Sequence, residues 1–222
     1  MRTSRALAPS IALLLSATVL AGCSGSDSGG SSGKSGSPSG STSASPYLPV
    51  PDGVTLTPQG THLEVGDAAV VAYEPRQDEV GALDLTVTKL EKTTTKKTLS
   101  AWQLTDAQKA STPYFVHVSV KNVGESDLGG RRVPLYVVNE DNLLLESTPF
   151  ASSFKACPST ALPKPFAAGA TADVCLVYLA PDHGTLEAVS FRPDEDFNPI
   201  TWTGEIEKYV PPKPKKKPKK KG

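Results

Sequence analysis

The chain has 222 residues and a formal net charge of zero, from 23 basic and 23 acidic side chains. This balance hides an asymmetry, because residues 47–207 hold 22 acidic against 12 basic residues while residues 211–222 hold seven lysines. About 160 residues lie between two low-complexity ends, which favours one domain with a sizeable core over several small ones. The middle of the chain is therefore predicted to be a single acidic domain.

The N-terminus has the three parts of an export signal. Arg2 and Arg5 form a short basic start, an apolar run covers residues 11–20, and small residues follow. A membrane span needs about 20 apolar residues, and this run is half as long before the sequence turns to Gly and Ser. Residues 1–22 are therefore predicted to be a signal peptide that is removed.

The signal ends in Leu20-Ala21-Gly22-Cys23, which resembles the bacterial lipobox, where the cysteine thiol receives a diacylglyceryl group and becomes the first residue of the mature protein. An exposed free cysteine is a liability in an oxidising compartment, whereas a lipidated one is inert. We predict lipidation of Cys23, with palmitate among the acyl chains, and a location on the outer face of the cell membrane. An ordinary signal peptide that leaves a free thiol is the alternative.

Residues 24–46 are nearly all Ser and Gly with a few Pro and Thr, and hold no side chain that could build a core. Such a composition predicts a flexible linker. Its typical end-to-end distance is about 25 Å, from about 5 to 6 Å times the square root of the number of residues. Residues 23–46 are therefore predicted to be a lipidated tether that holds the domain clear of the headgroups.

In residues 47–207, short runs of β-branched and apolar residues alternate with polar ones and are separated by Gly, Pro and Asp, which predicts an all-β fold. Eight strands are predicted, over residues 68–73, 83–90, 114–122, 133–138, 143–146, 172–179, 186–191 and 201–203. About seven to eight short strands suit an antiparallel β-sandwich. A short helical turn is predicted within residues 98–110.

The run 114–122 shows the alternation most clearly, and its even positions are predicted to face the core. These positions are Tyr114, Val116, Val118 and Val120. Residues 122–124 are predicted to form a turn, because Asn and Gly tolerate positive φ. A hairpin is predicted over residues 135–145, around the polar loop 139–142.

Cys157 and Cys175 remain when Cys23 carries lipid. In an exported protein an even pair predicts a disulfide, which should stabilise the fold by about 3 kcal/mol. A redox-active pair is the alternative, although the spacing is far from Cys-x-x-Cys.

Residues 211–222 alternate prolines with lysines. Residues 208–222 are therefore predicted to be a disordered, extended tail. One hypothesis is a polyanion-binding tail that holds anionic envelope polymers or lipid headgroups, at about 1 kcal/mol per lysine. A solvated tail is equally consistent, and the tail could also fold back onto the acidic domain. Nucleic acid is not expected as a partner of an exported protein. The lysines are Lys213, Lys215, Lys216, Lys217, Lys219, Lys220 and Lys221.

Short motifs follow one another between residues 66 and 202, which is most of the domain. They are Gly66-Asp67, Tyr114-x-Val-x-Val-x-Val-x-Asn-x-Gly124, Asp127-Leu128, the pair Cys157 and Cys175, and Ser190-Phe191-x-Pro193. In this order they resemble the telokin-like, immunoglobulin-type sandwich domains of actinobacterial surface lipoproteins. The resemblance implies an immunoglobulin-like (telokin-like) antiparallel β-sandwich without a cofactor, and it transfers no catalytic residue. One fold hosts many activities, so it implies little about function.

No catalytic or metal motif is found in the sequence. The three histidines, His62, His117 and His183, do not stand in a metal-binding spacing, and no Gly-x-Ser-x-Gly elbow is present. His117 is predicted on a sheet face and His183 in a hairpin turn over residues 181–184. The sequence therefore predicts no enzyme, no metal and no cofactor.

Two charged motifs leave alternatives open. Asp194-Glu195-Asp196 could bind calcium or form a solvated loop, although no EF-hand loop is matched. Arg131 and Arg132 follow Gly129-Gly130 and could meet an anion or simply enter a strand from a turn.

The functional hypothesis is a membrane-anchored binding or adhesion domain for an unspecified ligand. The alternative is an accessory or scaffold subunit of an envelope transport, secretion or wall-assembly complex.

Overall fold

The structure is a computed structural model that describes residues 47–150, 152 and 154–211. The predicted signal peptide, the lipidation site Cys23, the tether 24–46 and the tail lysines 213–221 lie outside these residues.

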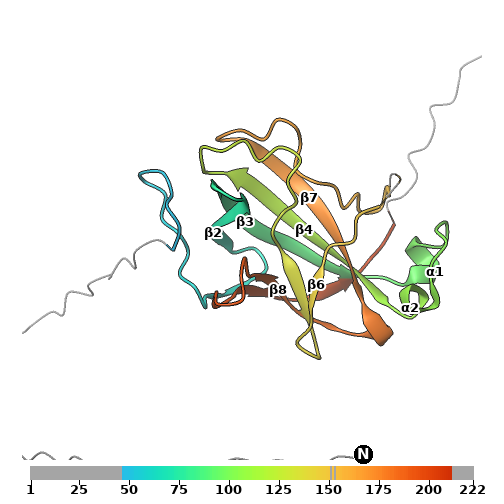
Figure 1. Ribbon diagram of the computed structural model, residues 1–222. Coiled ribbons are helices and arrows are strands. Elements are labelled where there is room, and N and C mark those ends of the chain that lie inside the picture. Colours follow the sequence, from blue (N-terminus) through green and yellow to red (C-terminus); the bar gives the residue numbers. More distant parts are fainter. Residues whose placement is uncertain (1–46, 151, 153, 212–222) are drawn as a thin grey trace, which may run out of the picture. The chain divides into compact units, whose positions relative to one another are not determined.

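Two five-stranded sheets make up the described part of the chain and give it a sandwich-like fold (Figure 1). The first sheet has the order β1-β9-β8-β5-β6, and its strands are β1 His62–Glu64, β9 Ile200–Thr203, β8 Leu186–Phe191, β5 Tyr136–Asn139 and β6 Leu144–Glu146. The second has the order β10-β3-β4-β7 with β2 also on β3, and its strands are β10 Ile206–Lys208, β3 Glu79–Lys92, β4 Thr112–Asn122, β7 Thr171–Ala180 and β2 Ala68–Arg76.

Each of the eight predicted strands is present, but the predicted number was too low, because the described residues form ten. The two missed strands, β1 and β10, have three residues each, too few to show an alternating pattern. Both pair in parallel, β1 with β9 and β10 with β3, so the prediction of an antiparallel sandwich holds for the remaining pairs only. β5 begins at Tyr136 rather than at residue 133, since Pro134 has no N–H to donate to a neighbouring strand.

The main core lies between the sheets and is built by the predicted alternation. Along β4, the side chains of Tyr114, Val116, Val118 and Val120 are all buried in it, as predicted. From the first sheet, Trp202 is fully buried, and its indole N–H donates to the carbonyl of Asp67 at 3.0 Å. Burying one such large apolar side chain contributes about 1.5 to 3 kcal/mol.

A second apolar cluster covers the outer face of the second sheet at one end. Phe115 and Val177, which point away from the main core, pack here with Leu99, Phe154 and Tyr209. Two short helices lie here, α1 Thr95–Thr98 and α2 Asp106–Lys109. The cover comes from the connection between them, through Leu99, Trp102 and Leu104, and from the segment that carries Phe154. The helical turn predicted within residues 98–110 corresponds to α2, which has a capping box between Thr105 and Gln108, whereas α1 lies almost entirely before that range and was not predicted.

Three connections test the turn predictions. Asn139 and Asn142 close the β5–β6 hairpin as predicted, with Asn142 at φ 58°. Residues 122–124 do not form a positive-φ turn. Instead, Asn122 is buried and donates to the carbonyls of Ser126 and Phe166, and a Cβ on Gly124 would lie 2.9 Å from the backbone nitrogen of Ala82. Residues 181–184 carry the chain from β7 to β8, which belong to different sheets, so the predicted hairpin turn there was wrong.

Candidate functional site: a binding groove

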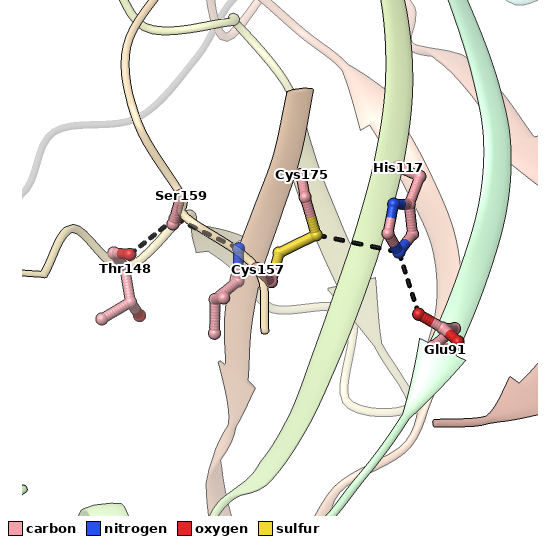
Figure 2. Close-up of a disulfide and its surroundings, with 7 residues drawn as sticks. Glu91, His117, Thr148, Cys157, Ser159 and Cys175 are labelled. Carbon is pink, nitrogen blue, oxygen red and sulfur yellow. Dashed lines mark hydrogen bonds and ion pairs between the residues drawn. A yellow bond between two sulfur atoms is a disulfide. The ribbon is translucent and has the colours of Figure 1, made fainter. Parts of the chain in front are cut away.

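The predicted disulfide between Cys157 and Cys175 is present, with the two Cα atoms 5.2 Å apart (Figure 2). It lies in a segment that is bonded to β7. Thr148 donates its backbone N–H to the carbonyl of Val177 at 2.7 Å, and Ser159 donates its own to the carbonyl of Cys175 at 2.9 Å. The segment therefore covers the outer edge of β7, which would otherwise present unpaired backbone groups to solvent.

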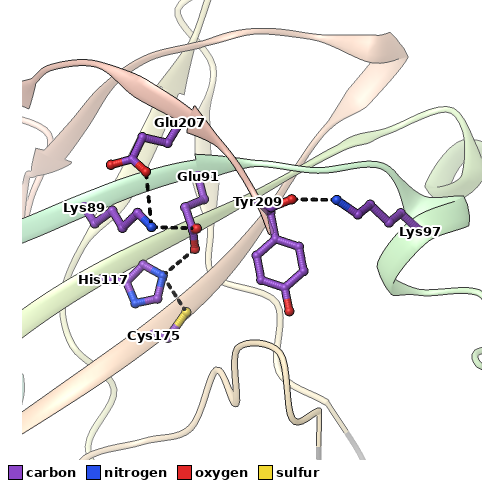
Figure 3. A network of polar contacts seen from close by, with 7 residues as sticks. All are labelled: Lys89, Glu91, Lys97, His117, Cys175, Glu207 and Tyr209. Atoms are coloured by element: carbon purple, nitrogen blue, oxygen red, sulfur yellow. Dashed lines mark hydrogen bonds and ion pairs between the residues drawn. The ribbon is translucent and has the colours of Figure 1, made fainter. Parts of the chain in front are cut away.

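A polar network lies beside the disulfide on the outer face of the second sheet (Figure 3). The carboxylate of Glu91 accepts from the ammonium of Lys89 at 2.8 Å and is 2.9 Å from Nε2 of His117. Lys89 also reaches Glu207 at 3.3 Å. His117 is thus on the sheet face, as predicted, and must donate from Nε2 because a carboxylate only accepts.

The charged groups of this network pair with one another. Burial raises the pKa of the Glu91 carboxyl, but the hydrogen bonds from Lys89 and His117 outweigh it, so the pKa is lowered overall. Nε2 of His117 also lies 3.8 Å from Sγ of Cys175. Both carboxylates, the ammonium of Lys89 and Nε2 of His117 each have a partner, which fits a role in holding β3, β4 and β10 together rather than in reacting with a ligand.

The opposite end of the second sheet is open. Tyr73, near the end of β2, is paired with Gly81, eight residues before Lys89 on β3, a distance of about 26 Å along the strand. Two hollows of about 480 and 380 Å³ adjoin there and share Tyr73, Pro134 and Tyr136. We call them together the tyrosine groove. A further hollow of about 630 Å³ continues from Tyr136 over residues 192–196.

Aromatic and proline side chains form the walls of the tyrosine groove. Tyr47 packs edge-to-face on Phe197, with ring centroids 4.9 Å apart, and its hydroxyl accepts from the backbone N–H of Ala72 at 3.1 Å. Phe197 in turn packs on the core residue Phe191. These contacts fix the aromatic wall before any ligand arrives.

One rim of the tyrosine groove is acidic. It carries Glu74, Asp194 and Asp196, and it continues to Glu195 beside the further hollow. None of the four carboxylates forms an ion pair within the described residues. The loop is held by its own backbone, since Oδ1 of Asp194 accepts from the N–H groups of Asp196 and Phe197 at 3.1 and 2.9 Å. The guanidinium of Arg192 contacts backbone carbonyls of this loop rather than carboxylates. We call these four residues the acidic rim.

The other end of the groove carries two arginines, and both guanidinium groups already have partners within the domain. Gly130 has φ 77° and leads into the irregular segment before β5, which fits the turn hypothesis for Gly129-Gly130. Arg131 lies 3.3 Å from Glu79, and Arg132 donates to the carbonyl of Ser147. Both arginines line the smaller hollow.

The floor of the groove holds a polar atom without a partner. Tyr73 is 7% exposed, and its hydroxyl oxygen has no hydrogen-bond partner within the described residues. Burial raises the pKa of Tyr73 to about 12, lowered in part by Arg131 and raised by Glu79. A buried, unpaired hydroxyl costs about 1 to 3 kcal/mol, so a ligand that offers an acceptor would gain from meeting it.

The predicted site residues do not converge. His62 bonds to the hydroxyl of Thr201 at 2.8 Å, His117 lies in the network by the disulfide, and His183 sits between β7 and β8. Asp194 and Asp196 line the groove, and Glu195 lines the further hollow beside it. No group of three metal-ligating side chains is found in the described part of the chain. Sequence reasoning missed the aromatic groove residues, which come from four separate segments: Tyr47, Tyr73, Tyr136 and Phe197. The one local signal was Tyr136, an aromatic residue on the outward face between Leu135 and Val137.

Comparison of the chain with protein-family models, curated proteins and solved structures gives no match. Among the helices of the described residues, none has the length and apolar character needed to cross a bilayer.

Proposed function

We propose that this protein is an extracytoplasmic lipoprotein, anchored through Cys23 on the outer face of the cell membrane, whose domain binds a ligand in the tyrosine groove without catalysing a reaction. The observation that carries the proposal is the fixed aromatic wall next to an acidic rim that forms no ion pair within the described residues. The export signal, the lipobox and the disulfide support the extracytoplasmic location.

We further propose that the sandwich is immunoglobulin-like, of the telokin-like type. Support comes from two facing sheets with a continuous core between them and from the disulfide that fixes a long connection to β7. In such sandwiches the loops gather at the two ends, and the groove lies at one of them.

The chemistry of the groove favours an extended cationic ligand. Tyr and Pro side chains offer flat apolar surface. Tyr73 also has a buried hydroxyl without a partner in the described residues, which could donate to a ligand carbonyl if its ring turned toward the groove. The acidic rim supplies four carboxylates. An open groove of this kind suits a peptide segment better than a small molecule, which a closed pocket would bury more completely.

Two measurements test the proposal. Mass spectrometry of the mature N-terminus should find acyl groups on Cys23, and an unmodified thiol there would remove the anchor. For the groove, the mature protein is tested against an array of twelve-residue peptides that vary in charge and proline content. We expect cationic, proline-containing peptides to bind and Tyr136→Ala to reduce their binding about tenfold, since aromatic anchors carry much of such interfaces.

The matched control for this test is Val138→Ala. Val138 lies two residues further along β5 on the same outward face but does not line the groove. It should leave peptide binding unchanged. Equal losses for both variants, or no groove-dependent binding to any peptide, would contradict a binding role for the groove.

A further inference from the structure

We propose that the tyrosine groove of one copy binds the proline- and lysine-rich segment 211–218 of a second copy. This inference rests on the proposed function of the groove and names its partner. The segment reads Pro-Pro-Lys-Pro-Lys-Lys-Lys-Pro, and all of it except Pro211 lies outside the described residues.

The segment has the composition that an aromatic groove recognises. Four prolines in eight residues favour the extended polyproline II conformation, which has three residues per turn and loses little entropy on binding. Such segments dock with proline rings on Tyr, Trp and Pro side chains. Tyr73, Pro134 and Tyr136 present such a surface.

The charges are complementary. Four lysines stand among the prolines of the segment, and four carboxylates without cation partners in the described residues form the acidic rim. The domain as a whole carries ten more acidic than basic residues over positions 47–207. Ligand lysines laid along the rim would therefore be attracted both by the rim and by the overall field of the domain.

The buried hydroxyl of Tyr73 supplies an independent reason for a peptide ligand. Backbone carbonyls in a polyproline II segment have no internal hydrogen bond and remain free to accept. The hydroxyl of Tyr73 has no partner within the described residues and belongs to a side chain that lines both hollows. The hydroxyl oxygen is itself buried, so a ligand carbonyl would satisfy both groups once the Tyr73 ring turned toward the groove.

The register of the sheet indicates that the bound segment comes from another copy. Tyr73 is paired with Gly81 at the start of β3, whereas Lys208 of β10 is paired with Lys92 at its end. Eleven residues of strand separate these positions by about 36 Å. From Tyr209 to Pro218 the chain spans at most about 28 Å in polyproline II. The segment therefore falls short of its own groove but is free to reach that of a neighbour.

The contact would be heterologous, because the groove of one copy meets a different surface of the next. Such contacts link copies head to tail. Lipid anchoring through Cys23 would confine the copies to one surface and raise their effective concentration, so that a weak contact becomes populated.

Crosslinking between isotopically distinct copies tests the proposal. A photoreactive amino acid replaces Lys216 in the lipidated protein, and unlabelled and ¹⁵N-labelled copies are mixed in lipid vesicles before irradiation. We expect crosslinks from position 216 to the peptides that contain Tyr136 or Asp196, with about half of them joining a light chain to a heavy one at equal mixing. Crosslinks that join only chains of the same isotope would mean binding within one copy and would overturn the proposal.

A charge-matched pair of variants makes the test specific. The triple variant Glu74→Gln, Glu195→Gln, Asp196→Asn removes three rim charges and keeps Asp194, which holds the loop. The triple variant Glu125→Gln, Asp173→Asn, Glu205→Gln removes three exposed charges that do not line the groove. We expect about a tenfold lower yield of light–heavy crosslinks for the rim variant and no change for the control. Equal yields would overturn the proposal.

The two proposals fail in different ways. Peptides of the array can bind the mature protein in a manner that depends on Tyr136 while position 216 gives no crosslink to the groove. In that case the inference is wrong, and the groove remains a binding site. If neither the array nor the crosslinking involves the groove, both are wrong.

Discussion

The two ends of the second sheet differ in how completely their side chains are satisfied. At the disulfide end, the outer face is covered by a second apolar cluster, and Glu91, Lys89 and His117 pair with one another. At the groove end, the acidic rim lacks cations within the described residues and Tyr73 holds an unpartnered hydroxyl. The contacts at the disulfide end thus stabilise the fold, whereas the groove end keeps polar groups that a ligand can pair with.

The largest effect should come from truncating the second apolar cluster. Phe115→Ala removes a fully buried ring that packs edge-to-face on Phe154 and Tyr209. We expect the free energy of unfolding to fall by about 3 to 5 kcal/mol, because truncation of a buried Phe leaves a cavity. Urea unfolding followed by circular dichroism measures it. A loss below about 1 kcal/mol would mean that the cluster is a loose cover and not a second core.

Removing the disulfide should have the next largest effect. The residues it joins are 18 apart in sequence. The double variant Cys157→Ala, Cys175→Ala should therefore lose about 3 kcal/mol by the loop-entropy relation. Reductant should lower the stability of the wild type to a similar extent and leave the double variant unchanged. A wild type that is insensitive to reductant in the unfolding experiment would contradict a stabilising bond.

A smaller, pH-dependent effect is expected at Glu91. Because the pKa of this carboxyl is lowered in the folded protein, the folded state binds the proton more weakly than the unfolded state. Its contribution is therefore present above the unfolded pKa of about 4.3 and is lost as the pH falls through the folded pKa. Glu91→Gln should lower stability by about 1 kcal/mol at pH 7 and reduce the loss of stability on acidification.

The control for Glu91 is Asp173→Asn, which removes an exposed carboxylate from β7. Urea unfolding of both variants and the wild type between about pH 7 and about pH 3 compares the three curves. If the curves for Glu91→Gln and the wild type remain parallel throughout, the network does not contribute to the acid dependence.

The sequence predicted the covered end of the molecule better than the open one. The alternation in β4 and the pairing of Cys157 with Cys175 follow local rules, period two and an even cysteine count in an exported chain. Strands β1 and β10 were not predicted, because a strand of three residues is too short to show an alternation of period two. Their parallel pairing also depends on contacts between residues more than 100 positions apart. The groove could not be predicted either, because its residues are also distant from one another in the sequence. Tyr73 and Tyr136 meet only once the sheets have formed.

The smallest change in stability is expected for Tyr73→Phe. This variant also tests most directly whether the groove end differs from the disulfide end in its unpaired polar groups. The substitution keeps the ring that fills the floor of the groove and removes only the hydroxyl that has no partner within the described residues. At the disulfide end, loss of a polar group costs stability because its partner is left alone. Here no partner is left, so we expect stability to be unchanged or to rise by up to about 1 kcal/mol. Crosslinking from position 216 to the groove should fall at the same time, since the ligand carbonyl loses its donor. Urea unfolding and the mixed-isotope crosslinking, made on the same preparation, measure both. A marked loss of stability would show that the hydroxyl is already satisfied within the folded domain, and the groove would then have no unfilled polar position to offer a ligand.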